Sequence, residues 1–308
     1  MKYGDGRHLI VVGDGPGLES LTTSGHIRSR PVGLLAENDL ALPDGWHYLG
    51  VVERLTEVLR DSRVAEVALC LQPSERHRLA TLAEVCMNAG VPAWLPLAAS
   101  RGGARARDPA GRVAKRAVDL VGSVFGLVVL APVLLTTAMA IAVIDGFPVF
   151  FIQPRAGLYG RPFPIVKFRT MGRDADGLRS ALRAENEIEG GASFKLASDP
   201  RVTRLGAILR KTSIDELPQL WNVLRGPMSL VGPRPHPYDD VAGYRPWQYR
   251  RLSVKPGMTG LWQVELRGGS DFDGWVRKDL EYIDGWSMWR DLTLIARTVP
   301  AILRGTGR

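Results

Sequence analysis

The sequence predicts an α/β module followed by a mostly α-helical, membrane-associated domain with a re-entrant helix. Over residues 7–99, short β-branched runs alternate with segments of helical spacing, which is typical of a parallel sheet. Residues 120–144 contain no charged side chain, and an apolar run of that length can enter a bilayer. A chain of 308 residues is long enough for both parts.

The first block, placed at residues 1–99, begins with the strand-like run HLIVV and the glycine-rich turn GDGPG. We expect further strands at 30–38, 64–72 and 91–97, and helices at 55–61 and 78–90. The turn has the spacing GxGxG, and Leu18 occupies the third glycine position of the dinucleotide-binding pattern. This favours a Rossmann-like module whose turn simply needs glycine. A nucleotide site remains an alternative, because Glu37 or Asp39 lies about where an acidic ribose ligand belongs.

Residues 100–116 are rich in glycine, arginine and alanine and have no apolar period, which predicts a basic linker. Residues 117–145 are the expected membrane segment, and Pro132 in its middle should bend the helix by removing a backbone hydrogen bond. Cations flank the segment on both sides, which conflicts with a single crossing under the positive-inside rule. We therefore expect a monotopic hairpin that returns to the same leaflet, with the soluble parts on the cytoplasmic side.

Composition narrows the class of partner. The net charge of +8 and the pI of 9.8 indicate an anionic partner, such as phosphorylated small molecules or an anionic membrane face. Nucleic acid is disfavoured, because the chain has neither basic runs interleaved with aromatics nor zinc-finger spacing. Cys70 and Cys86 lie in apolar contexts, which fits a reducing compartment. No secretory signal is visible, so the chain is expected to start in the cytosol.

The last block, residues 146–308, contains two amphipathic helical patterns, at 199–212 and 292–305. Such a pattern is typical of a helix lying in a membrane interface, although a surface helix that faces a protein core shares it.

Between these patterns, Asp215 and Glu216 stand side by side, closely preceded by Arg210. Ser213 and Glu216 match S-x-x-E, so the pair could merely form a capping box at a helix start. That reading leaves unexplained the glycine- and proline-rich loops RGPMSLVGPRPHP and KPGMTGLWQV, which are typical of a functional site.

Together these motifs resemble the bacterial sugar transferase family. The resemblance rests on KFRTM, DPRVTRLGAILRKTSIDELPQLWNVLRGPMSLVGPRP, KPGMTGLWQV and WSMWRDL, preceded by a proline-broken apolar helix, and covers about residues 112–305. Members of this type are monotopic polyprenyl-phosphate phosphoglycosyltransferases, and the longer ones carry an N-terminal Rossmann-like module. After GLWQV the chain departs from the Gly-Arg that many members carry, so the sugar is left open.

The resemblance implies transfer of a sugar 1-phosphate from a UDP-sugar to undecaprenyl (polyprenyl) phosphate, with release of UMP. This is the first membrane step of exopolysaccharide, capsule or O-antigen synthesis, on the cytoplasmic face of the bacterial inner membrane. Asp215 matches the nucleophile that forms an aspartyl-phosphosugar, and Glu216 matches its acidic neighbour. The positions expected to bind the substrate or its phosphates are Arg210, Arg234, Lys167, Arg169, Arg155 and Asp291. The resemblance also implies Mg²⁺, with Asp215 and Glu216 as its ligands, and leaves a homodimer open.

The chemistry of these residue types agrees with the resemblance. A carboxylate that attacks a diphosphate meets strong negative charge, so its site needs cations and a hard metal ion. Two alternatives stay open: a membrane-tethered nucleotide-binding regulatory protein that uses the N-terminal turn, and a catalytically inactive scaffold of a polysaccharide assembly system.

Overall fold

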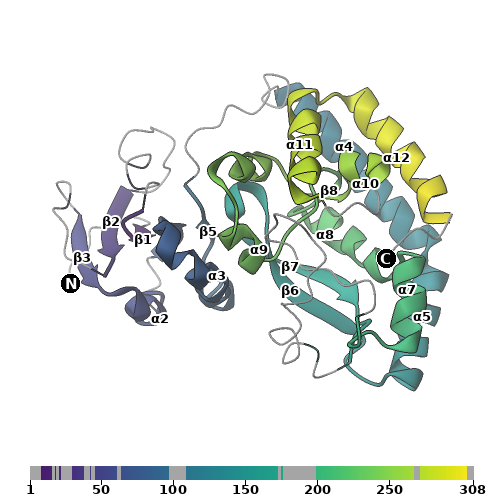
Figure 1. Cartoon of the computed structure of the whole chain (residues 1–308), viewed down its shortest axis with the longest axis horizontal. Helices are drawn as coiled ribbons and strands as arrows, with labels where there is room; N and C mark the ends of the chain where they lie inside the picture. Colours follow the sequence, from purple (N-terminus) through teal and green to yellow (C-terminus); the bar gives the residue numbers. More distant parts are fainter. Residues whose placement is uncertain are drawn as a thin grey trace. The chain divides into compact units, whose positions relative to one another are not determined.

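The computed structural model describes residues 8–15, 30–37, 46–60, 64–96, 109–172, 199–266 and 271–303, together with residues 18, 21, 42 and 175 (Figure 1). The chain divides into two compact units. The first unit comprises residues 1–100, 154–163 and 237–243, and the second comprises residues 101–153, 164–236 and 244–308.

A five-stranded parallel sheet forms the centre of the first unit. Its strands are β1 (His8–Val12), β2 (Arg30–Leu35), β3 (His47–Gly50), β4 (Val64–Leu69) and β5 (Ala93–Trp94), in the order β3-β2-β1-β4-β5. The predicted α/β architecture with a parallel sheet is therefore confirmed, and the strand order agrees with doubly wound sheets. The short strand β3 was not predicted from the sequence.

Two helices of the first unit lie near the predicted positions, at α2 (Leu55–Val58) and α3 (Leu79–Asn88). The 3-10 turns η1 (Val52–Arg54) and η2 (Pro73–Arg78) precede them. The core is built from β1, β2 and β4, where Leu9, Val11, Leu34 and Ala68 are fully buried.

Two later segments of the chain also belong to the first unit. Helix α9 (Tyr238–Ala242) packs on α3, and the Tyr238 hydroxyl donates a hydrogen bond to the Gly160 carbonyl in the 3-10 turn η4 (Leu158–Gly160).

The glycines after β1 are explained by close packing. Gly13 has a φ of 90°, and a Cβ at Gly15 would lie 2.4 Å from the Leu71 carbonyl oxygen. The amides of Gly13 and Gly15 donate hydrogen bonds to the carbonyls of Leu35 and Cys70, at 2.7 and 2.5 Å. Both amides are thus used inside the module, as expected for a turn that needs glycine for packing.

Glu37, one of the two candidate ribose ligands of the nucleotide-site alternative, is bound to other residues of the protein. Glu37 forms an ion pair with Arg78, with Oε1 and Nη1 2.6 Å apart, and Glu53 pairs with the same guanidinium. Asp39 lies outside the described residues.

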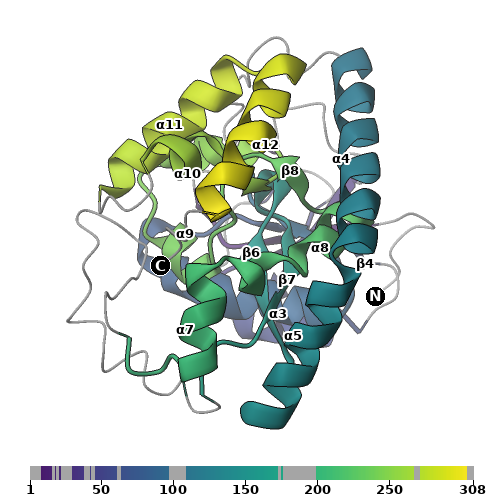
Figure 2. The same cartoon turned by 90° about the vertical axis from the view of Figure 1, so that its right-hand side faces the viewer.

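The second unit begins with two long helices, α4 (Pro109–Val129) and α5 (Ala131–Ile144). Residues 100–108 of the predicted linker lie outside the described part of the chain, whereas residues 109–116 are the first turns of α4 and not linker. The two helices meet at an angle of 60° around Leu130, and Pro132 is the second residue of α5 (Figure 2). The predicted bend is therefore present.

No single helix among the described residues is long and apolar enough to cross a bilayer; only α4 and α5 taken together meet that criterion, as a bent pair. Large apolar side chains are nevertheless exposed along both helices, namely Val121, Phe125, Val128, Leu135, Met139 and Val143.

The rest of the second unit consists of short helices and two small sheets. One sheet pairs β6 (Phe150–Ala156) with β7 (Pro162–Phe168), of which residues 154–156 and 162–163 are assigned to the first unit. The other sheet pairs β8 (Ser229–Val231) with β9 (Gly257–Thr259). The helices are α7 (Arg204–Lys211), α8 (Gln219–Arg225), α10 (Leu261–Glu265), α11 (Phe272–Asp284) and α12 (Met288–Leu303), with 3-10 turns η6 (Ile214–Glu216) and η7 (Pro246–Ser253).

One apolar cluster joins α5, β7 and α7. It contains Ile141, Phe168 and Leu209, with Leu205 and Ile214 packed against it. The predicted amphipathic helix therefore turns two of its leucines into a protein core, while Ile208 on the same helix is 61% exposed. This packing places the last turn of α7 beside the acidic pair that follows it in the chain.

Candidate active site

The acidic pair lies in η6, directly after a backbone kink at Ser213. Ser213 adopts left-handed angles, with φ 58° and ψ 17°, and its side chain makes no capping hydrogen bond. Helix α8 starts only at Gln219, after Pro218. The capping-box interpretation is therefore wrong, because the Glu216 side chain is bound to other partners.

Those partners are two cations from distant segments. Lys167 Nζ on β7 lies 3.0 Å from Glu216 Oε1, and Arg234 contacts both carboxylate oxygens, with Nη2–Oε1 at 2.5 Å and Nη1–Oε2 at 3.2 Å. Burial alone would raise the pKa of Glu216, but the charges and hydrogen bonds of Arg234 and Lys167 hold that pKa well below its usual range. Glu216 is thus an ionised anchor that gathers cations around the pair.

Asp215 has a different environment. Its side chain is buried, and among the described residues nothing donates a hydrogen bond to its carboxylate. Burial, followed by the charge of Glu216, raises the pKa of Asp215 to about 6, against the opposing effect of nearby cations such as Lys167 and Arg210. Two adjacent carboxylates with pKa values pushed apart are typical of a catalytic site.

Arg210 lies on the last turn of α7. Its Nε donates to the Thr170 hydroxyl at 2.9 Å, and burial lowers its pKa while the charge of Asp215 raises it. Within the described part of the chain no hydrogen bond involves its two Nη groups. Those groups are the donors that a bidentate contact to a phosphate requires.

Arg169, also expected to bind substrate, has a structural contact instead. Its Nη2 donates to the carbonyls of Asp145 and Gly146, at 2.7 and 2.5 Å, which end α5. Its Nε and Nη1 are buried and have no partner among the described residues. Arg169 thus holds the end of α5 to the residues that follow β7, and a contact with substrate stays a prediction.

Asp291, also expected to bind substrate, contacts three other side chains among the described residues. Asp291 is buried and accepts from Lys115 at 2.5 Å, from the Tyr282 hydroxyl at 2.7 Å and from Trp286 Nε1 at 3.2 Å, so it links α4, α11 and α12. Arg155 lies on β6 within the first unit. A substrate role for either residue remains a prediction from the resemblance.

Sequence reasoning missed two other contributors. The Asn222 side chain accepts from Val166 N at 2.9 Å and donates to Pro164 O at 2.7 Å, which fixes β7 just before Lys167. Arg251 is buried and donates to the carbonyl of Arg234 at 3.0 Å. Neither position lies in a pattern that marks burial, and both contacts join residues distant in the chain.

The donor set allows a direct assessment of Mg²⁺. In proteins this ion is held by one or two carboxylates together with phosphate oxygens. Both oxygens of Glu216 already accept from cations, and the described residues contain no group of three or more potential metal-binding side chains. Asp215 with the phosphate oxygens of a substrate fits Mg²⁺; Glu216 fits as a ligand only if it gives up its ion pairs.

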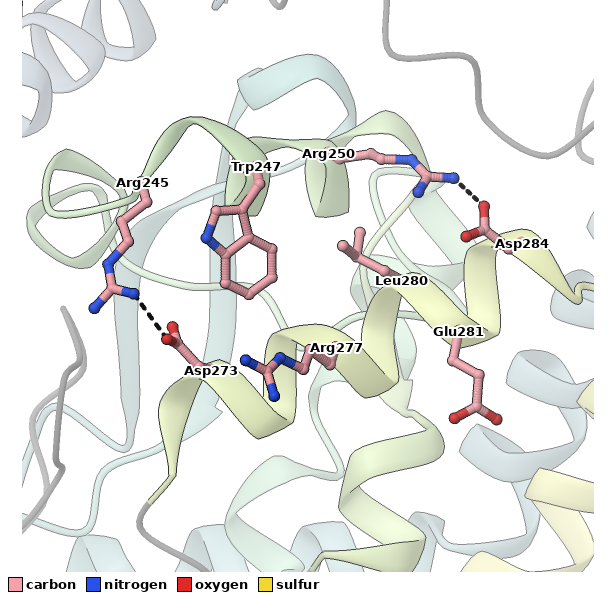
Figure 3. A pocket seen from close by; sticks show the side chains of 8 residues that line it. All are labelled: Arg245, Trp247, Arg250, Asp273, Arg277, Leu280, Glu281 and Asp284. Atoms are coloured by element: carbon pink, nitrogen blue, oxygen red, sulfur yellow. Dashed lines mark hydrogen bonds and ion pairs between the residues drawn. The ribbon is translucent and has the colours of Figure 1, made fainter.

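A separate groove of about 550 Å³ lies between η7 and α11 (Figure 3). Trp247 stands at its centre, and the ion pairs Arg245–Asp273 and Arg250–Asp284 close its two ends. None of the residues expected in the active site lines this groove.

Comparison with known proteins decides the family. The model of the bacterial sugar transferase family matches residues 110–305, which is more than half of the chain. The chain belongs to the bacterial sugar transferase family. This confirms the resemblance inferred from the motifs around Asp215.

Several curated members of the bacterial sugar transferase family are similar to this chain. Galactosyl transferase CpsE of Streptococcus agalactiae is 46% identical over 196 residues, which is 63% of this chain and 43% of that protein. UDP-glucose:undecaprenyl-phosphate glucose-1-phosphate transferase of Caulobacter vibrioides is 46% identical over 211 residues, or 65% and 74% of the two chains. Undecaprenyl-phosphate galactose phosphotransferase of Salmonella typhimurium is 40% identical over 199 residues, or 64% and 42%. This family member thus spans less than half of two of these relatives.

Proposed function

We propose that the protein transfers a sugar 1-phosphate from a UDP-sugar to undecaprenyl phosphate or a similar polyprenyl phosphate, and releases UMP. The observation that carries this proposal is the buried Asp215 carboxylate, which has no hydrogen-bond donor among the described residues and lies near three cations. The names of the Caulobacter and Salmonella relatives, which describe undecaprenyl-phosphate sugar transferases, support it.

In the proposed first step, an Asp215 oxygen forms a bond to the phosphorus that carries the sugar. The bond between that phosphorus and the bridging oxygen breaks, and UMP leaves with the electron pair. Arg210 and Arg234 would bind phosphate oxygens, and Lys167 would add a further positive charge; their contacts around the acidic pair support these roles.

In the proposed second step, an oxygen of the polyprenyl phosphate forms a bond to the same phosphorus, and the Asp215 carboxylate leaves. The lipid product then carries the sugar through a diphosphate. Glu216 does not react; its ion pairs hold Lys167 and Arg234 beside the nucleophile in both steps. A Mg²⁺ ion bound by Asp215 and the substrate phosphates would supply charge neutralisation for the diphosphate.

The membrane arrangement is part of the proposal. The bent pair α4–α5 would enter the cytoplasmic leaflet of the bacterial inner membrane and return, which places the active site where a water-soluble donor and a lipid acceptor meet. The exposed apolar side chains of both helices and the cationic flanks support this reading. The N-terminal unit would be the Rossmann-like module of longer family members.

The proposal is tested by UMP release from detergent-solubilised protein with undecaprenyl phosphate, Mg²⁺ and a panel of UDP-sugars. We expect release with one or a few UDP-sugars and a loss of at least about 10³-fold in Asp215→Asn, which keeps the shape but not the nucleophile. Wild-type protein that releases no UMP with any donor would instead support the scaffold alternative.

A further inference from the structure

The loop that carries Arg234 has few means of holding its own shape. Pro233 and Pro235 have no N–H group, so the loop cannot donate a backbone hydrogen bond at these two positions. It is held through its carbonyls: Gly257 N donates to Pro233 O at 2.8 Å, and Arg251 Nη2 donates to Arg234 O at 3.0 Å. The position of the Arg234 backbone therefore depends in part on what fixes Arg251.

Arg251 is fixed by a buried polar cluster. It is 2% exposed, its Nη2 also donates to Asp279 Oδ2 on α11 at 2.6 Å, and its Nη1 donates to the Tyr244 hydroxyl at 2.7 Å. The same Nη1 lies 3.0 and 3.1 Å from the two ring nitrogens of His236. A nitrogen equidistant from both cannot lie in the ring plane, because it would collide with the carbon between them, so the guanidinium lies against the ring face.

The cluster holds the Arg251 guanidinium in one position between α11 and the Arg234 carbonyl. A buried ion pair contributes little net stability compared with apolar packing, because desolvation offsets the attraction. A planar guanidinium, however, fixes several acceptors at defined angles, which a lysine ammonium on a flexible stem cannot reproduce. Arg251 thus sets the distance between α11 and the backbone of Arg234, three residues after β8 ends at Val231.

We propose that Arg251, held by Asp279, is a positioning residue that aligns Arg234 with the acidic pair and with the phosphates of the sugar donor. The inference rests on the proposed function. Arg251 does not touch the acidic pair; it acts through the Arg234 carbonyl, and Arg234 contacts Glu216 with both Nη groups. Its loss should therefore matter only while Arg234 is present.

The test is a double-mutant cycle between Arg251→Lys and Arg234→Ala, measured as kcat/KM for UMP release and as equilibrium binding of UDP-glucose and UDP-galactose. We expect Arg251→Lys to lower kcat/KM about 10- to 100-fold, since small displacements of positioned groups cost that much. In the Arg234→Ala background the same change should have no further effect. Arg250→Lys is the matched control, because Arg250 pairs with Asp284 at the surface, and it should match the wild type.

All variants are compared well below their unfolding midpoints. Should Arg251→Lys fail to fold, Tyr244→Phe replaces it in the cycle, since it removes only the hydroxyl that accepts from Arg251.

Losses that multiply in the double variant, or wild-type values for the single variant, would overturn the inference. If the wild type binds a UDP-sugar but releases no UMP, only the proposed function is overturned. The double-mutant cycle is then evaluated from the UDP-sugar dissociation constants. Wild-type protein that neither binds nor turns over any UDP-sugar of the panel would overturn both.

Discussion

Asp215 and Glu216 are chemically similar and adjacent, yet the structure gives them opposite ionisation behaviour. Cations from β7 and from the Arg234 loop stabilise the charge of Glu216, whereas Asp215 is buried without such a hydrogen-bonded partner among the described residues. A nucleophile with a raised pKa is a stronger base when ionised, and the nearby cations keep it in the range where it is ionised at neutral pH.

This difference predicts the pH dependence of catalysis. Because burial raises the pKa of Asp215 to about 6, kcat/KM for UMP release should rise with pH through about 6 and level off above it. Below that value it should fall about tenfold per pH unit, as the reactive carboxylate becomes protonated. Glu216→Gln removes a neighbouring negative charge and so should move this limb to lower pH. A limb that stays in place, or moves to higher pH, contradicts the assignment.

At the residue scale, sequence reasoning identified the acidic pair and most of its cations, because they lie in specific motifs. It did not predict what Glu216 contacts. The S-x-x-E spacing is a local signal, whereas the actual partners Lys167 and Arg234 are 49 and 18 residues away. The role of Arg251 was missed for the same reason, since nothing local marks this arginine as buried.

At the element scale, the packing of α7 against the residues after β7 determines where Arg210 lies. The helix packs directly on the backbone of β7's continuation: a Cβ at Gly206 would lie 2.1 Å from the Thr170 carbonyl oxygen. This close approach lets Arg210 Nε reach the Thr170 hydroxyl. The N-cap Thr203 adds a second anchor, because its hydroxyl accepts from Gly206 N and donates to Asp145 at the end of α5.

Gly206→Ala is therefore expected to destabilise the protein by about 1–3 kcal/mol and to reduce turnover, because α7 must move away from Thr170. The sign is diagnostic, since glycine to alanine inside an ordinary exposed helix stabilises by up to about 1 kcal/mol. Gly172→Ala is the control: its nearest atom would lie 4.0 Å away, and we expect a change within about 0.5 kcal/mol. Thermal unfolding and UMP release measure both effects, and a stabilised Gly206→Ala would refute this packing argument.

Elements with strong periodicity were predicted well, and short or packing-dependent ones were not. The strands at β1, β2 and β4 follow from their apolar runs, and α7 follows from the spacing of Leu205 and Leu209. Strand β3 has only four residues and no distinctive run. The early start of α4 was hidden by its glycine- and arginine-rich first turns, which are held by tertiary contacts such as Arg116 with the Val223 and Leu224 carbonyls.

At the scale of the whole molecule, the account requires that both ends of the α4–α5 pair face the same side of the membrane. The native Cys70 and Cys86 are buried, and burial raises the pKa of both thiols, which suppresses background labelling. We expect single cysteines introduced as Arg112→Cys and Arg161→Cys, both at exposed positions, to react alike with a membrane-impermeant maleimide. Both should be protected in intact cells and labelled in inverted vesicles. Labelling from opposite sides would show a crossing instead of a re-entrant hairpin.

In the proposed mechanism, Asp215 forms an acyl phosphate with the sugar phosphate before any lipid acceptor binds. Intact-protein mass spectrometry of wild-type protein incubated with its UDP-sugar and Mg²⁺, without polyprenyl phosphate, tests this most directly. We predict a mass increase of one sugar phosphate, one equivalent of UMP, and no increase in Asp215→Asn. UMP that appears only when the acceptor is added, with unmodified protein throughout, would contradict the account.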